Sequence, residues 1–352
     1  MYPSKLNPTY GIFVKQTYDW LSDNYNVTLV KITKQKSFVK KFFAYMLFYI
    51  KSIIFGLFGN YNLIYAHFIS HSALSVRIIK FFKSNLKVVG NIHGEDVFFQ
   101  YEKFSKNRKR SENFLKQADF IISPSSYYKN RLSNEYNFPK EKIFISPSGG
   151  IDINLFKSLD IATCRKKIDL NLTKKYIGFA SRLEKGKGCD VLIKAFSKLN
   201  VSDYMLLIVG NGSEENSLRN LVQSLNISDK VIFMPLLPHK KLTYFYNSLD
   251  VFCFPSESES LGLVGLEAMS CETLCVVSNN AGIMTYAINE NNSIVFKKSN
   301  EQDLTSKLQK AIYFNKNKKQ QIKINARKTA MRYSSEKVKK EFLDFFNEVL
   351  KI

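Results

Sequence analysis

The stretch "KYIGFASRLEKGKGCDVLIKAF", residues 175–196, carries the pattern that decides the fold. Its first part, "KYIGFAS", is a short apolar run typical of a buried β-strand, and a glycine-containing loop follows it. The last part, "CDVLIKAF", has the apolar spacing of an amphipathic helix. A strand that leads through a short loop into a helix is the unit from which parallel sheets covered by helices are built.

The same alternation continues along almost the whole chain. The expected strands fall into two series, 27–32, 63–68, 86–92, 119–123, 142–147 and then 175–181, 204–210, 230–235, 250–256, 273–278. Two series favour two doubly wound α/β domains that face each other across a cleft, joined near 149–160, where glycines coincide with a loss of pattern. We therefore predict an N-terminal Rossmann-like domain at 1–155 and a C-terminal one at 156–333. A final amphipathic helix at 334–352 is expected to pack back toward the first domain.

The composition of the 352 residues is that of an ordinary globular protein, with 45% hydrophobic residues, except for a net charge of +22. The five cysteines complete no zinc pattern, and we interpret them as reduced, mostly buried cysteines of a cytoplasmic protein. No run of 18 apolar residues is free of charge, so we expect no transmembrane helix. The first residues lack the apolar region of a signal peptide, so none is expected.

Basic and aromatic residues are interleaved in "KQKSFVKKFFAYMLFYIKSIIFGLF", residues 34–58. No acidic residue stands between Asp23 and Glu95. A basic face beside an aromatic face suits an interfacial helix on an anionic membrane, because apolar burial and attraction to headgroups add. The alternative is a core-packing helix with a solvated lysine face. No nucleic-acid-binding module is recognisable, so we expect no nucleic-acid partner.

A second informative stretch is "SESESLGLVGLEAM", residues 256–269, which follows the expected strand 250–256. Glu259 lies in a loop at the carboxyl end of that strand, and Glu267 lies about one turn into a helix. Gly262 lets backbone N–H groups near the helix N-terminus approach an anion closely. Carboxylates accept hydrogen bonds from hydroxyl groups, so the stretch fits a sugar diphosphate. The alternative is a pair of acids that only complement the helix dipole.

Two further strand-end loops carry candidate residues. Arg182 and Lys187 follow the strand 175–181 and would stabilise a leaving diphosphate without a metal. The alternative is that they are two solvated surface cations. Gly210 and Gly212 in "IVGNGSEE" form a loop that could hold a nucleotide, a weaker indication by itself.

These motifs resemble the retaining glycosyltransferases of family 4, which have the GT-B fold. The resemblance runs across nearly the whole chain and is strongest from about 149 to 296. The family's E-x7-E pair matches Glu259 and Glu267, and its "GRL…KG" motif matches Arg182 and Lys187. "GGID" resembles the "NGVD" of the family's domain junction, and "VGNG" its "VGdG". "NIHGED", residues 91–96, resembles the "HGxD" loop of the first domain, and "YPSKLNPTYGIF" its glycine-containing first loop.

The resemblance implies transfer of a sugar from a nucleotide donor with retention at the anomeric carbon. It implies that Glu259 holds hydroxyls of the donor sugar and that Glu267 binds the nucleotide ribose. Arg182 and Lys187 would stabilise the departing diphosphate, and His93 would lie against the donor sugar or the acceptor. The remaining implied residues are Asp96 on the acceptor side and, around the donor, Gly11, Gly210, Gly212, Leu261, Gly262 and Leu263. No cofactor and no metal are expected, since no D-x-D motif stands at a strand end.

The sequence departs from the family pattern in two regions. It begins at "MYPS", where the family has a β-strand before the first loop, so we expect the central strand of the first sheet to be missing, through a misassigned start or a truncation. The family's "CGxPVV" reads "CETLCVV" here, and its "GxPE" reads "GIMT". These two motif changes fall near the sugar and base of the donor. They leave the identity of the donor open, with UDP favoured over GDP.

The favoured interpretation is a metal-independent hexosyltransferase (EC 2.4) that extends a lipid-linked or polysaccharide acceptor. The glycan would be a bacterial capsule, a lipopolysaccharide O-antigen or another exopolysaccharide, assembled by a peripheral enzyme at the inner face of the cell membrane. A GT-B sugar-nucleotide epimerase is one alternative, and a non-catalytic sugar-nucleotide-binding protein is another. Donor turnover without an acceptor product would favour the epimerase, and binding without turnover the non-catalytic protein.

Overall fold

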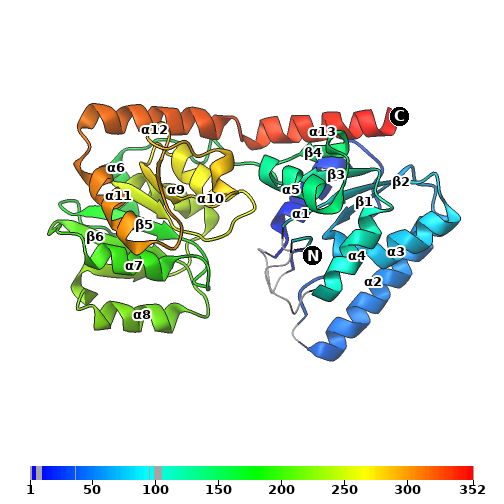
Figure 1. Cartoon of the computed structure of the whole chain (residues 1–352), viewed down its shortest axis with the longest axis horizontal. Helices are drawn as coiled ribbons and strands as arrows, with labels where there is room; N and C mark the ends of the chain where they lie inside the picture. The colour runs from blue at the N-terminus through cyan, green and yellow to red at the C-terminus, as the bar shows by residue number, and fades with distance from the viewer. Residues whose placement is uncertain (1, 5–9, 36, 95, 99–104, 352) are drawn as a thin grey trace. The chain divides into compact units, whose positions relative to one another are not determined.

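The computed structural model describes residues 2–4, 10–35, 37–94, 96–98 and 105–351. The chain forms two compact units, residues 1–149 with 338–352 and residues 150–337 (Figure 1). The division falls at Gly149 and Gly150, slightly before the expected boundary at 155, and the helix expected at 334–352 contributes its residues from Val338 onward to the first unit. The residues 5–9 of the first glycine-containing loop and Lys36 lie outside the described residues.

The first unit contains a four-stranded parallel sheet in the order β1-β2-β3-β4. Its strands are short apolar runs, β1 Leu63–His67, β2 Lys87–Asn91, β3 Phe120–Ser123 and β4 Ile143–Ile145. Its helices are α1 Ile12–Ser22, α2 Phe38–Phe58, α3 Ile69–Phe82, α4 Ser105–Leu115, α5 Ser126–Tyr136 and the 3₁₀ turn η2 Lys140–Lys142, and α13 spans Ser335–Lys351. Both faces of the sheet are covered, since one apolar cluster joins Val88 to α3 and another joins Val89 to Phe342 of α13.

The predicted strand at 27–32 is wrong, because these residues belong to no sheet. Among the described residues, β1 pairs only with β2 and forms the edge of its sheet. A cavity of about 550 Å³ lies between β1 and residues 26–32, and its walls include side chains of α1, α2, α3 and α13. A β-strand exists only through hydrogen bonds to a neighbour. The run 27–32 has the apolar, β-branched composition of a strand but faces this cavity instead of a partner.

The second unit contains a six-stranded parallel sheet in the order β10-β9-β8-β5-β6-β7. The strands are β5 Lys175–Ala180, β6 Tyr204–Val209, β7 Val231–Met234, β8 Val251–Phe254, β9 Cys275–Ser278 and β10 Ile294–Phe296. The helices and 3₁₀ turns are α6 Ile161–Lys167, α7 Cys189–Ser197, α8 Glu215–Ser224, η3 Ser228–Lys230, α9 His239–Ser248, α10 Leu263–Ser270, η4 Ile283–Thr285, α11 Glu301–Tyr313 and α12 Lys316–Met331. The short strand β10 was not predicted from the sequence.

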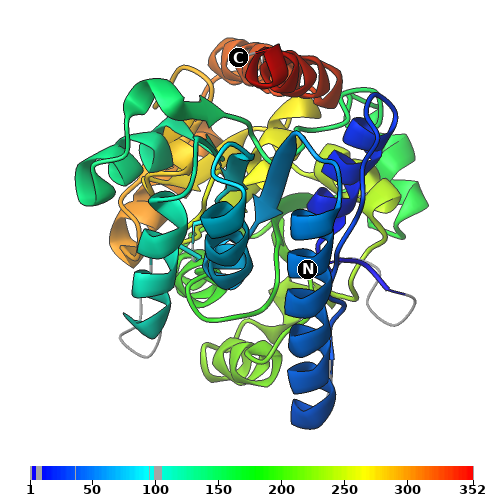
Figure 2. The ribbon, with the colours of Figure 1, turned by 90° about the vertical axis from the view of Figure 1, so that its right-hand side faces the viewer.

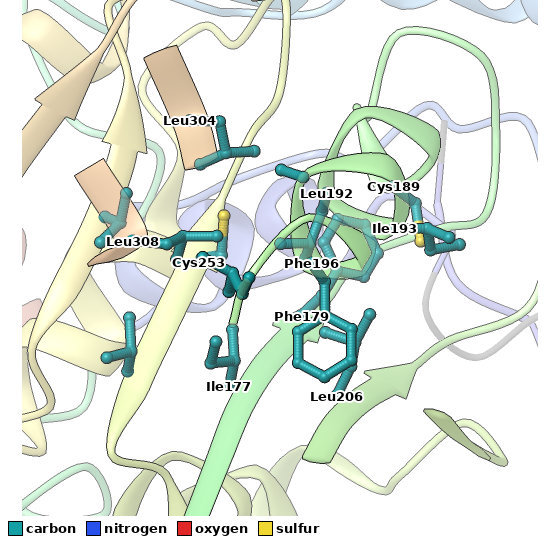
Figure 3. Packing of buried hydrophobic residues seen from close by; sticks show 14 of the residues in the cluster. Ile177, Phe179, Cys189, Leu192, Ile193, Phe196, Leu206, Cys253, Leu304 and Leu308 are labelled. Carbon is teal, nitrogen blue, oxygen red and sulfur yellow. The ribbon is translucent and has the colours of Figure 1, made fainter. Parts of the chain in front are cut away.

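The core of the second unit explains why its strands read as continuous apolar runs. Ile177 and Phe179 of β5 pack against Leu192 and Phe196 of α7 on one face of the sheet (Figure 3). Tyr176 and other residues of the opposite face join a second cluster with α9 and α10. All five cysteines are free and buried, as predicted. Burial on both faces leaves the carboxyl ends of the strands as the place for polar, functional loops.

Candidate active site

The loops after β5 and β8 lie next to each other in the second unit. The two strands are hydrogen-bonded neighbours, although β6 and β7 intervene in the chain. The strand order therefore reverses at this point, which is where open parallel sheets bind their ligands. The backbone N–H of Glu257 donates to the carbonyl oxygen of Gly186 over 2.9 Å and ties the two loops together.

Lys187 and Glu259 form an ion pair between these loops, with 2.7 Å from Nζ to Oε1. Both side chains are only 18% exposed, so their attraction is less screened than that of a surface pair. The hydroxyl of Ser256 donates to the same Oε1 atom over 2.7 Å. Ser256 is itself buried, and its backbone carbonyl accepts a hydrogen bond from the side chain of Asn280. The carboxylate of Glu259 is therefore held in place while its other oxygen, Oε2, can take further donors.

Arg182 follows β5 and has a different environment from Lys187. Its guanidinium lies 2.8 Å from Glu184 and is 68% exposed. The loop that contains Gly210 and Gly212 packs beside it, because the N–H of Leu183 donates to the carbonyl of Asn211 over 2.8 Å. Gly210 has a φ of 146°, and a side chain there would collide with the carbonyl of Ser181. The glycine is thus needed for the close approach of the two strand-end loops.

Glu267 lies in α10 and is almost fully buried. Its Oε1 lies 3.1 Å from Nε2 of His239, and its Oε2 accepts a hydrogen bond of 3.0 Å from the hydroxyl of Tyr246. The hydrogen bond to Glu267 raises the pKa of His239. Burial raises the pKa of Tyr246 well above its ordinary value, and the charge of Glu267 adds to this. Tyr246 therefore remains a hydrogen-bond donor to Glu267 throughout the physiological range.

The residues around Gly262 begin helix α10. Gly262 has a φ of 86°, in the left-handed region, and a side chain there would meet the ring of Phe254. Leu261 is buried in the core beneath the loop, and Leu263 is the first helical residue. Backbone N–H groups of a first helical turn have no intrahelical acceptor, so this end of α10 favours an anion. The N-terminus of α10 therefore lies between Glu259 and Glu267 in the chain, and Lys187 contacts Glu259 from the loop after β5.

The first unit contains the other predicted site residues, Gly11, His93 and Asp96. Gly11 precedes α1 with a φ of 74°. Asp96 is buried, and its Oδ1 accepts the backbone N–H of His93 over 2.8 Å. Burial raises the pKa of Asp96 to about 6, although backbone N–H groups, including that of Ile69, oppose this by stabilising the carboxylate. Asp96 therefore positions the backbone of the loop, and its contacts do not show it as a group directed at an acceptor.

His93 is one end of a chain of hydrogen-bonded side chains, in which both histidines are partly buried and Thr17 is buried. Its Nε2 lies 3.1 Å from Nδ1 of His67, and Nε2 of His67 lies 3.1 Å from the Thr17 hydroxyl. The two imidazole rings are stacked with 10° between their planes. Burial lowers the pKa of His93 to about 3 and that of His67 well below its ordinary value, so both rings are neutral at pH 7.

This arrangement indicates which ring nitrogens carry protons. The Thr17 hydroxyl lies 3.1 Å from the carbonyl oxygens of Phe13 and Val14, which can only accept. If its proton points to them, Thr17 accepts from Nε2–H of His67, whose bare Nδ1 then accepts from Nε2–H of His93. Nδ1 of His93 is then left as an acceptor. Phe13 and Phe68 pack against this ring at 4.6 and 4.4 Å between centroids.

Sequence reasoning missed four residues that contact the predicted ones: Ser256, His239, Tyr246 and His67. Ser256 stands at the end of a predicted strand, and that position was the available signal. His67 also ends a predicted strand, in "YAHF", and a histidine at that position could have been noted. His239 and Tyr246 lie on α9, at sequence distances from Glu267 that no local pattern connects.

Family models match almost the whole of both units. Residues 160–329 match the family described as glycosyl transferases group 1, and residues 14–154 match glycosyltransferase family 4. The chain belongs to glycosyltransferase family 4. The predicted recognition is confirmed, and the motifs in the two strand-end loops lie within the matched regions.

Relatives of this family-4 chain match about half of it. The D-inositol 3-phosphate glycosyltransferase of Acidothermus cellulolyticus is 31% identical over 179 residues, 48% of this chain and 40% of that protein. An uncharacterized glycosyltransferase of Methanocaldococcus jannaschii is 33% identical over 179 residues, 49% of this chain and 46% of that protein. The chain therefore spans about half the length of the curated relatives it matches.

Solved structures show that the fold of this family-4 chain is GT-B. Sucrose-phosphate synthase from Thermosynechococcus elongatus has a TM-score of 0.78 at 19% identity, covering 97% of this chain and 93% of its own. Anabaena Alr3699/HepE in complex with UDP has a TM-score of 0.74 at 20% identity, covering 86% and 82%. The predicted fold class of two parallel α/β domains is confirmed.

Proposed function

We propose that the protein is a retaining glycosyltransferase that moves a hexose from a nucleotide-diphosphate sugar. The observation that carries the proposal is the contact of Lys187, Glu259 and Ser256 at the carboxyl ends of β5 and β8. It unites a cation suited to a leaving diphosphate with a carboxylate suited to sugar hydroxyls. Family membership supports the reaction class, and structures of the neighbour HepE with UDP and with UDP-glucose support a UDP-sugar as donor.

The residues have separate roles in this reaction. Lys187 and Arg182 stabilise negative charge on the departing diphosphate, which is the largest catalytic contribution of the protein. Glu259 orients the donor sugar, and Glu267 binds the ribose, with His239 and Tyr246 holding its carboxylate. The backbone around Leu261, Gly262 and Leu263 lies against the diphosphate. We propose that these cations act without a bound metal.

We propose a lipid-linked or polysaccharide acceptor from bacterial surface glycan synthesis, and a peripheral location at the inner face of the cell membrane. The basic and aromatic residues of α2 support this location, because lipid-linked acceptors lie in anionic membranes. On this proposal His93 contacts the donor sugar or the acceptor. The epimerase and the non-catalytic sugar-nucleotide-binding protein are the two rival functions.

The experiment begins with UDP, GDP, ADP and CMP and their sugars added to the whole protein without metal, while thermal unfolding is followed. A shift in the unfolding midpoint with UDP alone supports the proposed donor class. Turnover of the UDP-sugar is then measured with and without lipid-diphosphate acceptors. Turnover without an acceptor product would indicate the epimerase, and a UDP shift without turnover would indicate the non-catalytic protein. Absence of any shift in a cooperatively unfolding protein would refute a functional donor site.

A further inference from the structure

Helix α2 of the first unit presents a large apolar face to solvent. In Figure 2 it is the long mid-blue helix that extends downward. Its exposed apolar side chains are Phe38, Val39, Phe42, Phe43, Met46, Leu47, Ile50, Ile54, Phe55 and Phe58. Surface helices of globular proteins are normally polar on the solvent side, and contiguous exposed apolar patches of this kind mark interaction sites.

The opposite face of α2 holds it on the fold. Gly56 is its buried residue and lies against Ile79 of α3, where a larger side chain would collide with Ile79. The hydroxyl of Tyr45 lies 3.5 Å from Nδ1 of His71, which is also on α3. Lys83 donates from Nζ to the carbonyl of Gly59 over 2.8 Å and so joins the ends of the two helices.

The end of α3 extends the apolar face of α2. Because Gly56 contacts Ile79 and Gly59 contacts Lys83, the carboxyl ends of the two helices lie side by side. Phe58, Phe81 and Phe82 are 84, 82 and 68% exposed at these ends. We call this face, together with the exposed residues of α2, the α2–α3 surface.

The charges around the α2–α3 surface are positive. Lys40, Lys41 and Lys51 on α2 and Arg77 on α3 are exposed beside the apolar residues. No acidic residue stands anywhere between Asp23 and Glu95 in the sequence, so nothing acidic on these helices offsets them. An apolar face whose own two helices carry cations and no acids is complementary to an anionic lipid headgroup layer over an acyl interior.

Among the described residues, α2 is the helix that could cross a membrane by length and composition. Its connections oppose that placement. The chain enters α2 from residues 10–35 and leaves it into β1, and both segments belong to the same compact unit. The ends of a spanning helix would lie on opposite sides of the bilayer, about 30 Å apart across its core, and the sheet and its covering helices would have to separate.

We propose that the α2–α3 surface docks on anionic bilayers, with α2 parallel to the membrane plane and its exposed phenylalanines below the headgroups. The unit then acts as a monotopic anchor that needs no spanning segment. The inference extends the proposed peripheral location to named residues and an orientation. Membrane binding itself does not require the proposed transfer reaction, so the two can be tested separately.

The test uses the whole protein and extruded vesicles of phosphatidylcholine alone or with about one-third phosphatidylglycerol. Sedimentation gives the bound fraction. The apolar variant is Phe58→Ser/Phe81→Ser/Phe82→Ser, and its matched control is Leu236→Ser/Ile288→Ser/Tyr313→Ser, at exposed apolar positions of the second unit. We expect the apolar variant to lose at least tenfold in partitioning onto anionic vesicles and the control to bind like the parent.

A charge variant tests the electrostatic part. Lys40→Gln/Lys41→Gln/Lys51→Gln removes three exposed lysines of the surface, and Lys157→Gln/Lys316→Gln/Lys328→Gln removes the same charge from the second unit. Each lysine near an anionic surface strengthens binding about fivefold, so the first variant should bind anionic vesicles about 100-fold more weakly. Vesicle binding by the second variant should be little changed. Raising the salt concentration should reduce binding of the parent in the same direction.

Depth measurements test the orientation. Tryptophan is introduced separately as Leu47→Trp at the middle of α2 and Phe58→Trp at its end, and its fluorescence is quenched with spin labels in the headgroup or deep in the acyl chain. A helix in the membrane plane gives the same shallow depth at both positions, whereas a spanning helix gives unequal depths and would overturn the orientation.

Two outcomes would overturn the docking proposal as a whole. One is equal vesicle binding by the apolar variant and its control. The other is no vesicle binding together with a dimer that light scattering detects and the apolar variant dissociates, which would make the surface an interface between copies. The UDP-induced thermal shift, measured on the same variants, reports the donor site. Its loss in the parent would refute the proposed function and leave the vesicle result standing.

Discussion

Removing the ammonium group of Lys187 should reduce turnover of the donor sugar about 10²-fold or more. The Lys187 side chain is 18% exposed and lies 2.7 Å from Glu259, so its charge acts where water screens it less than at the surface. Loss of one preorganised charge contact to a transition state typically costs about 10²–10³ in kcat, or about 2.7–4 kcal/mol. Lys187→Ala should therefore lower kcat/KM, with the larger part of the loss in kcat, because the contact strengthens as the diphosphate departs.

The same substitution should have a smaller effect on folding. Glu259 keeps the hydrogen bond from Ser256 when Lys187 is removed. The pair is neither fully exposed nor fully buried, so we expect a loss of about 1–2 kcal/mol in the free energy of unfolding. Turnover is measured as UDP release from UDP-sugars at a temperature where the variant remains folded, with unfolding followed separately.

The matched control is Lys175→Ala. Lys175 begins β5 at the opposite end of the strand and forms a pair of 2.8 Å with Asp203, which is half exposed. Its removal should leave turnover close to that of the parent. The argument for Lys187 fails if Lys187→Ala retains turnover within about threefold of the parent, or if Lys175→Ala loses as much activity as Lys187→Ala.

Three further predictions concern the candidate donor site of the second unit and the histidine pair of the first unit. UDP at 100 times its dissociation constant should stabilise the parent by about 2.7 kcal/mol and raise its thermal unfolding midpoint. The variant Glu267→Gln should lose most of that rise. An unchanged rise in the variant would place the ribose elsewhere. The hydrogen bond to Glu267 raises the pKa of His239 in the folded protein. Protonated His239 therefore stabilises the fold fully below its ordinary pKa of 6.5, and this contribution is lost as pH rises through the higher pKa of the folded state. His239 is 62% exposed, so the free energy of unfolding from denaturant titration should fall by well under 1 kcal/mol across this pH range. The variant His239→Gln should abolish that pH dependence. A free energy of unfolding that rises with pH would contradict the predicted direction. Proton–nitrogen NMR correlation spectra should show His93 and His67 neutral, each with its proton on Nε2. The variant His67→Asn should preserve this tautomer of His93, and His67→Phe should disrupt it. Protons on Nδ1 would mean that the chain of hydrogen bonds runs in the opposite direction.

Most of the fold could be predicted because parallel strands that are buried on both faces read as apolar runs. Nine of the expected strands are present, from β1 to β9, with bounds that differ by a few residues at most. The run 27–32 has the same composition but is not a strand. Composition indicates that a segment can enter a sheet, whereas a strand also needs a neighbour, and a cavity lies on the side of 27–32 that faces β1. The three-residue strand β10 was missed, although β4 is equally short and was predicted.

The site could be predicted to the extent that its residues stand at strand ends. Lys187 and Glu259 were both placed at carboxyl ends, and adjacency of β5 and β8 brings them together. The roles of these residues remain predictions. The partners of Glu267 could not be found in this way, because His239 and Tyr246 reach it from a different helix through packing. The same holds for His67, whose contact with His93 depends on the pairing of β1 with β2.

Both cations assigned to the diphosphate of the donor are paired with a carboxylate in this structure, and this has a mechanistic consequence. Lys187 pairs with Glu259, and Arg182 pairs with Glu184. On the proposed function, a diphosphate competes with Glu259 for the charge of Lys187, and drawing Lys187 toward the diphosphate loosens its bond to Glu259. That loosening frees a carboxylate oxygen for the hydroxyls of the donor sugar. Binding of the diphosphate and binding of the sugar are then coupled through a single ion pair. A nucleoside diphosphate alone would leave Glu259 with only Ser256 as a partner, whereas the intact donor satisfies both partners of the broken pair. The effects of Lys187→Ala and Glu259→Gln on donor affinity should consequently be less than additive, because each substitution removes the same exchange of partners.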